Sequence, residues 1–157
     1  MTSDFLLVPL AIEEFLPLFE LSDEQLRERA AMWLVADAKP GFPCRVSLAD
    51  AEVGERVLAI SFTHHDVQTP YRGSGPVFVR ERAEPAELRV NEVPIMLQHR
   101  LLSLRGYDSS GMMLAAKVVP GAELVAAINE HFNDPHVEYQ HIHNASPGCF
   151  NCAVRRA

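Results

Sequence analysis

Alternating apolar and polar side chains predict β-strands along much of the chain. The clearest case is residues 56–64, where Leu58, Ile60 and Phe62 alternate with smaller or more polar side chains and form the expected core face. A half-buried strand shows this two-residue period because successive side chains point to opposite sides of the sheet. Further strands are expected at residues 5–10, 45–48, 77–80, 101–107, 112–119 and 136–144.

Helical spacing and start signals predict helices at three places. Ser22 and Gln25 have the arrangement of a capping box, which predicts a helix over residues 23–31. Residues 32–35 fit either the last turn of this helix or a strand. The other helices are expected over residues 93–100 and between Gly121 and Asn133.

Together these elements predict an α+β fold, with residues 1–157 as a single globular domain. The hydrophobic content of 48% is sufficient for a buried core in a chain of 157 residues. We expect a mixed, mostly antiparallel sheet with two or three helices packed on it. The strands at 112–119 and 136–144 are joined through a helix, which is long enough for a crossover, so we expect them to run parallel.

Charge and composition exclude some classes of partner. A formal net charge of −7 and a pI near 5.4 argue against a protein that binds the nucleic-acid backbone, which would need a basic face. No apolar run approaches the ~20 residues of a membrane span, and the first residues lack the basic start of a signal peptide. We therefore expect a cytoplasmic protein with neither a nucleic-acid nor a membrane partner.

The densest group of reactive side chains lies near the end of the sequence. His141, His143, Cys149 and Cys152 provide two imidazoles and two thiols within a dozen residues. Two imidazole nitrogens and two thiolates suit tetrahedral zinc, provided that the turn at Ser146-Pro147-Gly148 folds the cysteines back onto the histidines. In an enzyme, such a metal with one open coordination position would activate water for hydrolysis.

The same four residues allow two other interpretations. Cys149 and Cys152 form a Cys-x-x-Cys pair that would act as a redox dithiol, although here the motif does not precede a helix as in thioredoxin-like proteins. Alternatively, the histidines are hydrogen-bonded inside a pocket and the cysteines fill small apolar spaces. Cys44 is either an accessory thiol of this cluster or a buried side chain.

A second candidate site lies in the aperiodic segment that follows the strand at 56–64. His64 continues the expected core face of that strand, and Tyr71, Arg72, Gly73 and Gly75 follow in the loop. Glycines let backbone N–H groups approach a ligand, and the arginine fork suits a carboxylate or phosphate. These residues predict a site for a small anionic ligand, whereas the alternative is ordinary turn chemistry.

The sequence resembles an uncharacterised bacterial family, domain of unknown function 1203 (DUF1203). The resemblance rests on KPGFPCRVSL at 39–48, GPVFVRE at 75–81, RLLSLRGYD at 100–108 and HIHNASPGCFNC at 141–152. It implies a small single-domain bacterial protein in the cytoplasm and brings no established activity. Three functions therefore stay open: a metal-binding or small-ligand-binding module, a thiol-redox protein, and a structural or interaction domain without chemistry.

Overall fold

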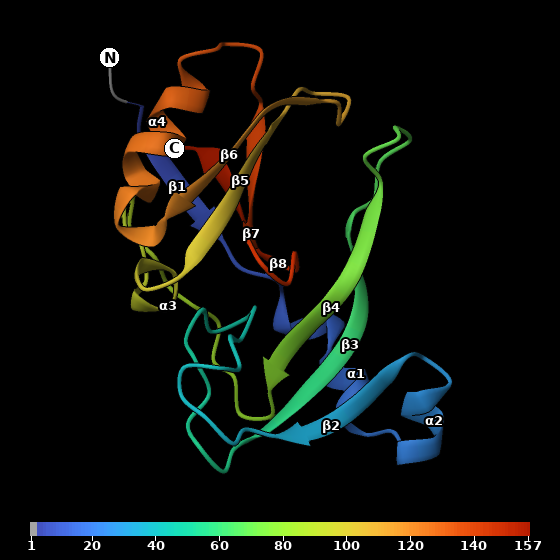
Figure 1. Ribbon diagram of the computed structural model, residues 1–157. Coiled ribbons are helices and arrows are strands. Elements are labelled where there is room, and N and C mark those ends of the chain that lie inside the picture. The colour runs from blue at the N-terminus through green and yellow to red at the C-terminus, as the bar shows by residue number, and fades with distance from the viewer. Residues whose placement is uncertain (1–2) are drawn as a thin grey trace.

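Two antiparallel sheets make up most of the structure, a computed structural model that describes residues 3–157 (Figure 1). The five-stranded sheet has the order β1-β8-β7-β5-β6, and the three-stranded sheet has the order β2-β3-β4. The strands of the five-stranded sheet are β1 (Phe5–Val8), β5 (Leu101–Tyr107), β6 (Met113–Pro120), β7 (Tyr139–Asn144) and β8 (Phe150–Arg156). The strands of the three-stranded sheet are β2 (Ala31–Val35), β3 (Arg56–His65) and β4 (Gly73–Arg80).

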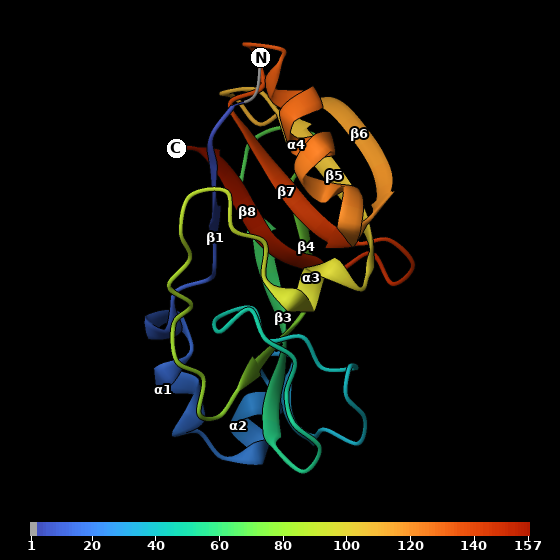
Figure 2. The same cartoon turned by 90° about the vertical axis from the view of Figure 1, so that its left-hand side faces the viewer.

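Four short α-helices accompany the sheets. They are α1 (Leu16–Phe19), α2 (Asp23–Arg27), α3 (Ile95–Gln98) and α4 (Leu124–Phe132), and the 3-10 helices Ile12–Glu14 and Gly121–Glu123 precede α1 and α4. Figure 2 shows α4 lying across one face of the five-stranded sheet. None of the helices within residues 3–157 is both long enough and apolar enough to span a lipid bilayer.

The main core lies between α4 and the five-stranded sheet. Leu124 and Ile128 of α4 pack with Leu104, Ile142 and Val154 of the sheet, and all five are fully buried. A second core lies beneath the three-stranded sheet, where buried Leu58 and Val79 meet side chains of the helical segment 12–27. The chain thus has an α4-covered half and an α1/α2-covered half, with the opposite face of the five-stranded sheet turned toward β3 and β4.

The predicted α+β class is confirmed, and the detail of the sheets differs from the expectation. The strands form two sheets instead of one mixed sheet. β6 and β7 run in the same direction, as expected, because each pairs antiparallel with β5. They are not neighbours, since β5 lies between them and α4 crosses over it.

Several predicted boundaries also change. The helix expected over 23–31 ends at Arg27, and the ambiguous residues 32–35 belong to β2. Residues 45–47 form a turn and not the predicted strand. β4 begins at Gly73, four residues before the expected start, and the strand β8 was not predicted.

Candidate ligand site where the sheets meet

The predicted histidine and cysteine ligands lie on different faces of the five-stranded sheet. Along β7, Tyr139, His141 and His143 alternate with Gln140 and Ile142, which face α4. On the neighbouring strand Cys152 pairs with Ile142 and packs into the same core. The cysteine therefore lies across the sheet from His141 and His143.

The zinc site predicted from His141, His143, Cys149 and Cys152 is consequently not assembled. Cys152 is fully buried in the core, where burial raises the pKa of its thiol to about 12. Within residues 3–157 no group of three or more His, Cys, Asp or Glu side chains is placed to hold a metal ion. Cys152 does not reach the histidines because the final segment closes as a β-hairpin, in which this residue of β8 faces α4.

His141 and His143 instead meet two histidines from the end of β3. We call His64, His65, His141 and His143 the histidine cluster. The ring centroids of His64 and His143 are 5.0 Å apart, as are those of His65 and His141. Phe150 stacks on His64 at 5.3 Å and adds an apolar side to the cluster. Contacts between these aromatic rings therefore connect the C-terminal end of β3 to β7.

Burial keeps the imidazoles from β7 neutral near pH 7. Together with the neighbouring histidines and Arg105, burial lowers the pKa of His141 to about 3. Burial also lowers the pKa of His143 to about 4. Nδ1 of His143 donates to the carbonyl of Gly148 at 2.9 Å, so its buried Nε2 carries the lone pair and has no partner.

Two tyrosines, which the sequence argument did not select as site residues, extend the cluster. His65 donates from Nδ1 to the carbonyl of Tyr71 at 2.8 Å and accepts at Nε2 from the hydroxyl of Tyr139 at 2.6 Å. Tyr107 stacks on Tyr139, with ring centroids 5.4 Å apart. Tyr139 shares the strand face of His141 and His143, so the two-residue period contained a signal for it.

Arg45 is the side chain that sequence reasoning missed altogether. It is only 1% exposed. Its Nε donates to the carbonyl of Phe150 at 2.7 Å, and its Nη1 donates to the carbonyl of Pro43 at 2.6 Å. Of the carboxylates in residues 3–157, none lies within ion-pair distance of this guanidinium. Burial lowers the pKa of Arg45, and electrostatic attraction to Cys149 opposes that effect.

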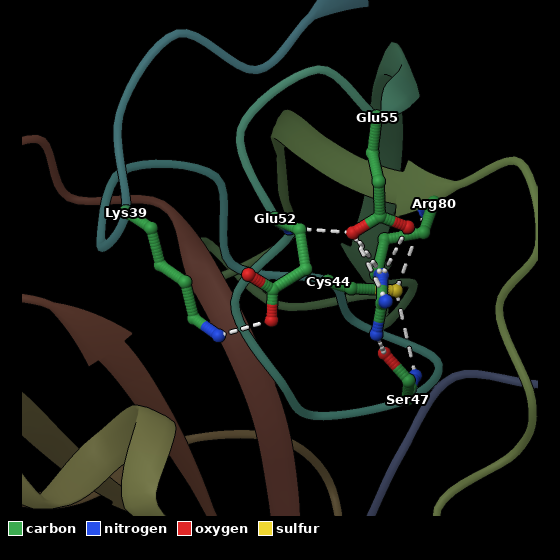
Figure 3. A network of polar contacts seen from close by, with 6 residues as sticks. All are labelled: Lys39, Cys44, Ser47, Glu52, Glu55 and Arg80. Carbon is green, nitrogen blue, oxygen red and sulfur yellow. Dashed lines mark hydrogen bonds and ion pairs between the residues drawn. The ribbon is translucent and has the colours of Figure 1, made fainter.

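Cys44 stabilises the turn that contains Arg45. Its sulfur accepts hydrogen bonds from the backbone N–H groups of Ser47 and Arg80, each at 3.4 Å (Figure 3). Arg80 in turn pairs with Glu55 through its Nε at 3.0 Å. Cys44 is fully buried in the core of the three-stranded sheet, whereas Cys152 lies in the core under α4. Cys44, the predicted accessory thiol, is therefore in a different core from Cys152 and has a structural place in its turn.

Cys149 and Arg45 both line a cleft between the sheets. The cleft has a volume of about 610 Å³, and its lining includes Phe78 of β4, Leu101 of β5 and the β7–β8 turn. Cys149 is partly exposed, and its sulfur accepts a hydrogen bond from Nδ2 of Asn144 at 3.2 Å. The cleft therefore combines apolar walls with one thiol, one amide and one buried cation.

The structure brings together only some of the residues of the predicted anion-binding loop. His64 belongs to the histidine cluster, and a Cβ added to Gly73 would lie 3.0 Å from its Nε2. Gly75 continues β4, Tyr71 is 39% exposed, and Arg72 donates from Nε to the carbonyl of Val67 at 2.9 Å. Binding of a ligand by these five residues stays a prediction.

The fold and the site define an α+β protein with an arginine- and thiol-lined cleft between two antiparallel sheets. Residues 41–156, most of the chain, match the family model described as protein of unknown function (DUF1203), and the chain belongs to this family. No curated protein and no solved structure matches the chain significantly.

Proposed function

We propose that the protein binds a small anionic ligand in the cleft and that Arg45 is the side chain that holds the anion. The observation that carries this proposal is a buried guanidinium without a carboxylate partner among residues 3–157. Burying a charged group without an opposite charge costs roughly several kcal/mol, so buried charges in proteins are normally paired. A carboxylate or phosphate group in the cleft would supply the missing negative charge.

The other guanidinium that lines the cleft, that of Arg100, is already paired. Both nitrogens of its fork contact Asp50, at 3.0 Å and 2.5 Å. These contacts leave Arg45 as the cation whose charge a ligand would balance. Nε and one N–H of Nη1 in Arg45 already donate to backbone carbonyls, so the remaining N–H groups of the planar fork are the ones that would donate to an oxyanion.

The walls of the cleft indicate the rest of the ligand. Phe78 and Leu101 supply apolar surface, while Asn144 and Cys149 supply polar contacts. The volume of about 610 Å³ fits a small metabolite. The ligand class is therefore a small organic acid or phosphate ester with an apolar portion. A cytoplasmic location and the absence of a nucleic-acid partner stay predictions from the sequence.

Titration with inorganic phosphate and with benzoate tests the proposal. At constant ionic strength, one of these probes should raise the melting temperature of the protein in a saturable manner, because a ligand that binds only the native state stabilises it. Arg45→Lys should weaken binding about tenfold or more, since lysine lacks the fork. Arg89→Lys is the matched control because the Arg89 side chain is 89% exposed.

Two results would contradict the proposal. One is the lack of any saturable shift with either probe up to about 100 mM, a range that covers even weak fragments. The other is equal binding by the wild type and by a folded Arg45→Lys variant. Either result would mean that the cleft does not hold a small anion through Arg45.

A further inference from the structure

A hydrogen-bond donor and a cation lie near the sulfur of Cys149. Asn144 donates to it from Nδ2 at 3.2 Å, and the Arg45 guanidinium attracts it electrostatically. Oδ1 of Asn144 accepts from Nδ2 of Asn151 at 2.7 Å, which fixes the amide with its N–H toward the sulfur. A cation and a fixed N–H donor are the features that activate a cysteine for attack.

Access distinguishes Cys149 from the other two thiols. Cys149 is partly exposed and lines the cleft, whereas Cys44 and Cys152 are fully buried. A reagent that enters the cleft from solvent reaches Cys149 first. The buried Arg45 beside it has no carboxylate partner in residues 3–157, so the charge next to this sulfur is not cancelled.

No second thiol is placed to form a disulfide with Cys149. Cys152 faces the core under α4, and turning its side chain toward Cys149 would break the pairing of Cys152 in β8 with Ile142 in β7. The sulfur of Cys44 is occupied by the N–H groups of Ser47 and Arg80. A disulfide requires Cβ atoms about 3.8 Å apart, and the side chain of Cys152 points into the core under α4 while Cys149 lines the cleft between the sheets. The Cys-x-x-Cys spacing is therefore not a dithiol.

We propose that Cys149 is a single-cysteine redox site that hydroperoxides oxidise to a sulfenic acid. The thiolate attacks the distal peroxide oxygen; an S–O bond forms and the O–O bond breaks. Sulfur loses two electrons, and the leaving oxygen takes the proton to give water or an alcohol, with sulfenate as the other product. Arg45 and Asn144 hold the sulfenate oxygen and its negative charge.

Return to the thiol uses a low-molecular-weight thiol from solution. The first thiol molecule condenses with the sulfenic acid, which releases water and forms a mixed disulfide with Cys149. A second thiol molecule then attacks this disulfide, so that Cys149 leaves as the thiolate and the small thiol becomes a symmetric disulfide. The site thus cycles without Cys152. This goes beyond the binding of an anion and does not depend on it.

Trapping with dimedone tests the site in the full chain. Reduced protein in anion-poor buffer is treated with equimolar hydrogen peroxide and dimedone, and each cysteine peptide is quantified by mass spectrometry. We expect the adduct on Cys149, with a rate at least about tenfold above that of the same cysteine in the urea-unfolded chain, because unfolding removes both donors. Cys152→Ala should react within about twofold of wild type, since the mechanism assigns Cys152 no part.

Two outcomes overturn the proposal. One is a Cys149–Cys152 disulfide as the main product, and the other is labelling of Cys149 that is no faster in the folded than in the unfolded chain. The comparison with the unfolded chain needs no variant, so a folding defect cannot obscure it. Because the phosphate and benzoate titrations are measured on the reduced protein without peroxide, failure of the redox site and failure of anion binding are distinguishable.

Discussion

At the scale of single residues, burial sets the charge of the histidine cluster. His141 is 6% exposed and His143 is 1% exposed, and no carboxylate in residues 3–157 forms an ion pair with either ring. The cluster consequently keeps its shape only while its rings are neutral. Protonation would place like charges about 5–6 Å apart in a layer closed by Phe150.

Stability should therefore fall as the pH drops below about 6.5, the ordinary histidine pKa in an unfolded chain. The pKa values of His141 and His143 in the fold are about 3 and about 4, so between these values and 6.5 the unfolded chain binds more protons. The free energy of unfolding should decrease by about 1 kcal/mol per histidine from pH 7 to pH 5.5. Urea denaturation at both pH values measures this.

Substitutions of single histidines test whether the histidine cluster causes this pH dependence of stability. His141→Gln should lose about 1 kcal/mol less than wild type over the same pH step, because the glutamine has no proton to take up. His136→Gln, whose ring is 83% exposed, is the control and should keep the wild-type slope. Equal slopes for the wild type and His141→Gln would contradict the assignment.

The two cysteines of the Cys-x-x-Cys motif should differ in their effect on stability. Cys152→Ser buries a hydroxyl in the apolar core under α4 and should cost about 2 kcal/mol. Cys149→Ser changes a partly exposed side chain and should cost no more than about 0.5 kcal/mol. Chemical denaturation at pH 7 compares them, and similar losses would mean that the two sulfurs share an environment.

Residue patterns predicted one part of the candidate site and missed another. The period of β7 correctly placed Tyr139, His141 and His143 on one face. Arg45 lay in a segment that fits a strand, and its burial depends on the carbonyls of Pro43 and Phe150. One of these acceptors is more than a hundred positions away, so no local pattern contains it.

At the scale of elements, strand pairing overrode local preference in β4. Residues 73–76 read Gly-Ser-Gly-Pro, which is typical of a turn, yet they pair with the end of β3. β4 is an edge strand, where a proline is tolerated because one side of the strand has no ladder to complete. Cys152 and Val154 of β8 pack under α4, whereas Phe150 lies on the histidine-cluster face, since the pairing of β7 with β8 shifts register between Ile142 and His143. The sequence pattern does not contain this shift, and the cysteines were interpreted as ligands.

The junction of α3 with the 3-10 helix before α4 depends on Gly121. A Cβ at this position would lie 1.9 Å from the carbonyl oxygen of Leu97 and 2.8 Å from the Gln98 backbone. Gly121→Ala should therefore destabilise the protein by more than about 2 kcal/mol, since backbone atoms cannot move aside easily. Thermal and urea unfolding measure the loss.

Gly75 provides the matched control within a strand. An added Cβ there meets nothing within 4 Å, so Gly75→Ala should change the free energy of unfolding by no more than about 0.5 kcal/mol. A small effect of Gly121→Ala, comparable with that of Gly75→Ala, would show that the two helices do not pack as closely as the structure has them.

At the scale of the whole molecule, a buried ion pair connects the two halves. Asp50 belongs to the long segment between β2 and β3, and Arg100 directly precedes β5. Their side chains are 4% and 15% exposed. The α+β class and most strands followed from periodicity, whereas this connection between the halves did not, because charged residues in loops carry no period.

Asp50→Asn should cost about 3 kcal/mol, because it leaves the Arg100 charge buried without its partner. Glu130→Gln is the control: its pair with Lys117 is exposed at both ends, and its loss should cost no more than about 0.5 kcal/mol. Urea unfolding followed by Trp33 fluorescence and by far-ultraviolet circular dichroism measures both variants. A loss for Asp50→Asn as small as the control would mean that other contacts join the halves.

The place of β8 between β1 and β7 has a consequence for biosynthesis. β1 is made before the other strands of its sheet, but its partner is made about 150 residues later, since Phe5 pairs with Arg156. Until then the nascent chain exposes the open edges of β1 and β7, which are available to other chains. Slow translation of the codons for β8 would prolong that exposure, so aggregation of the nascent protein should respond to the translation speed of this strand.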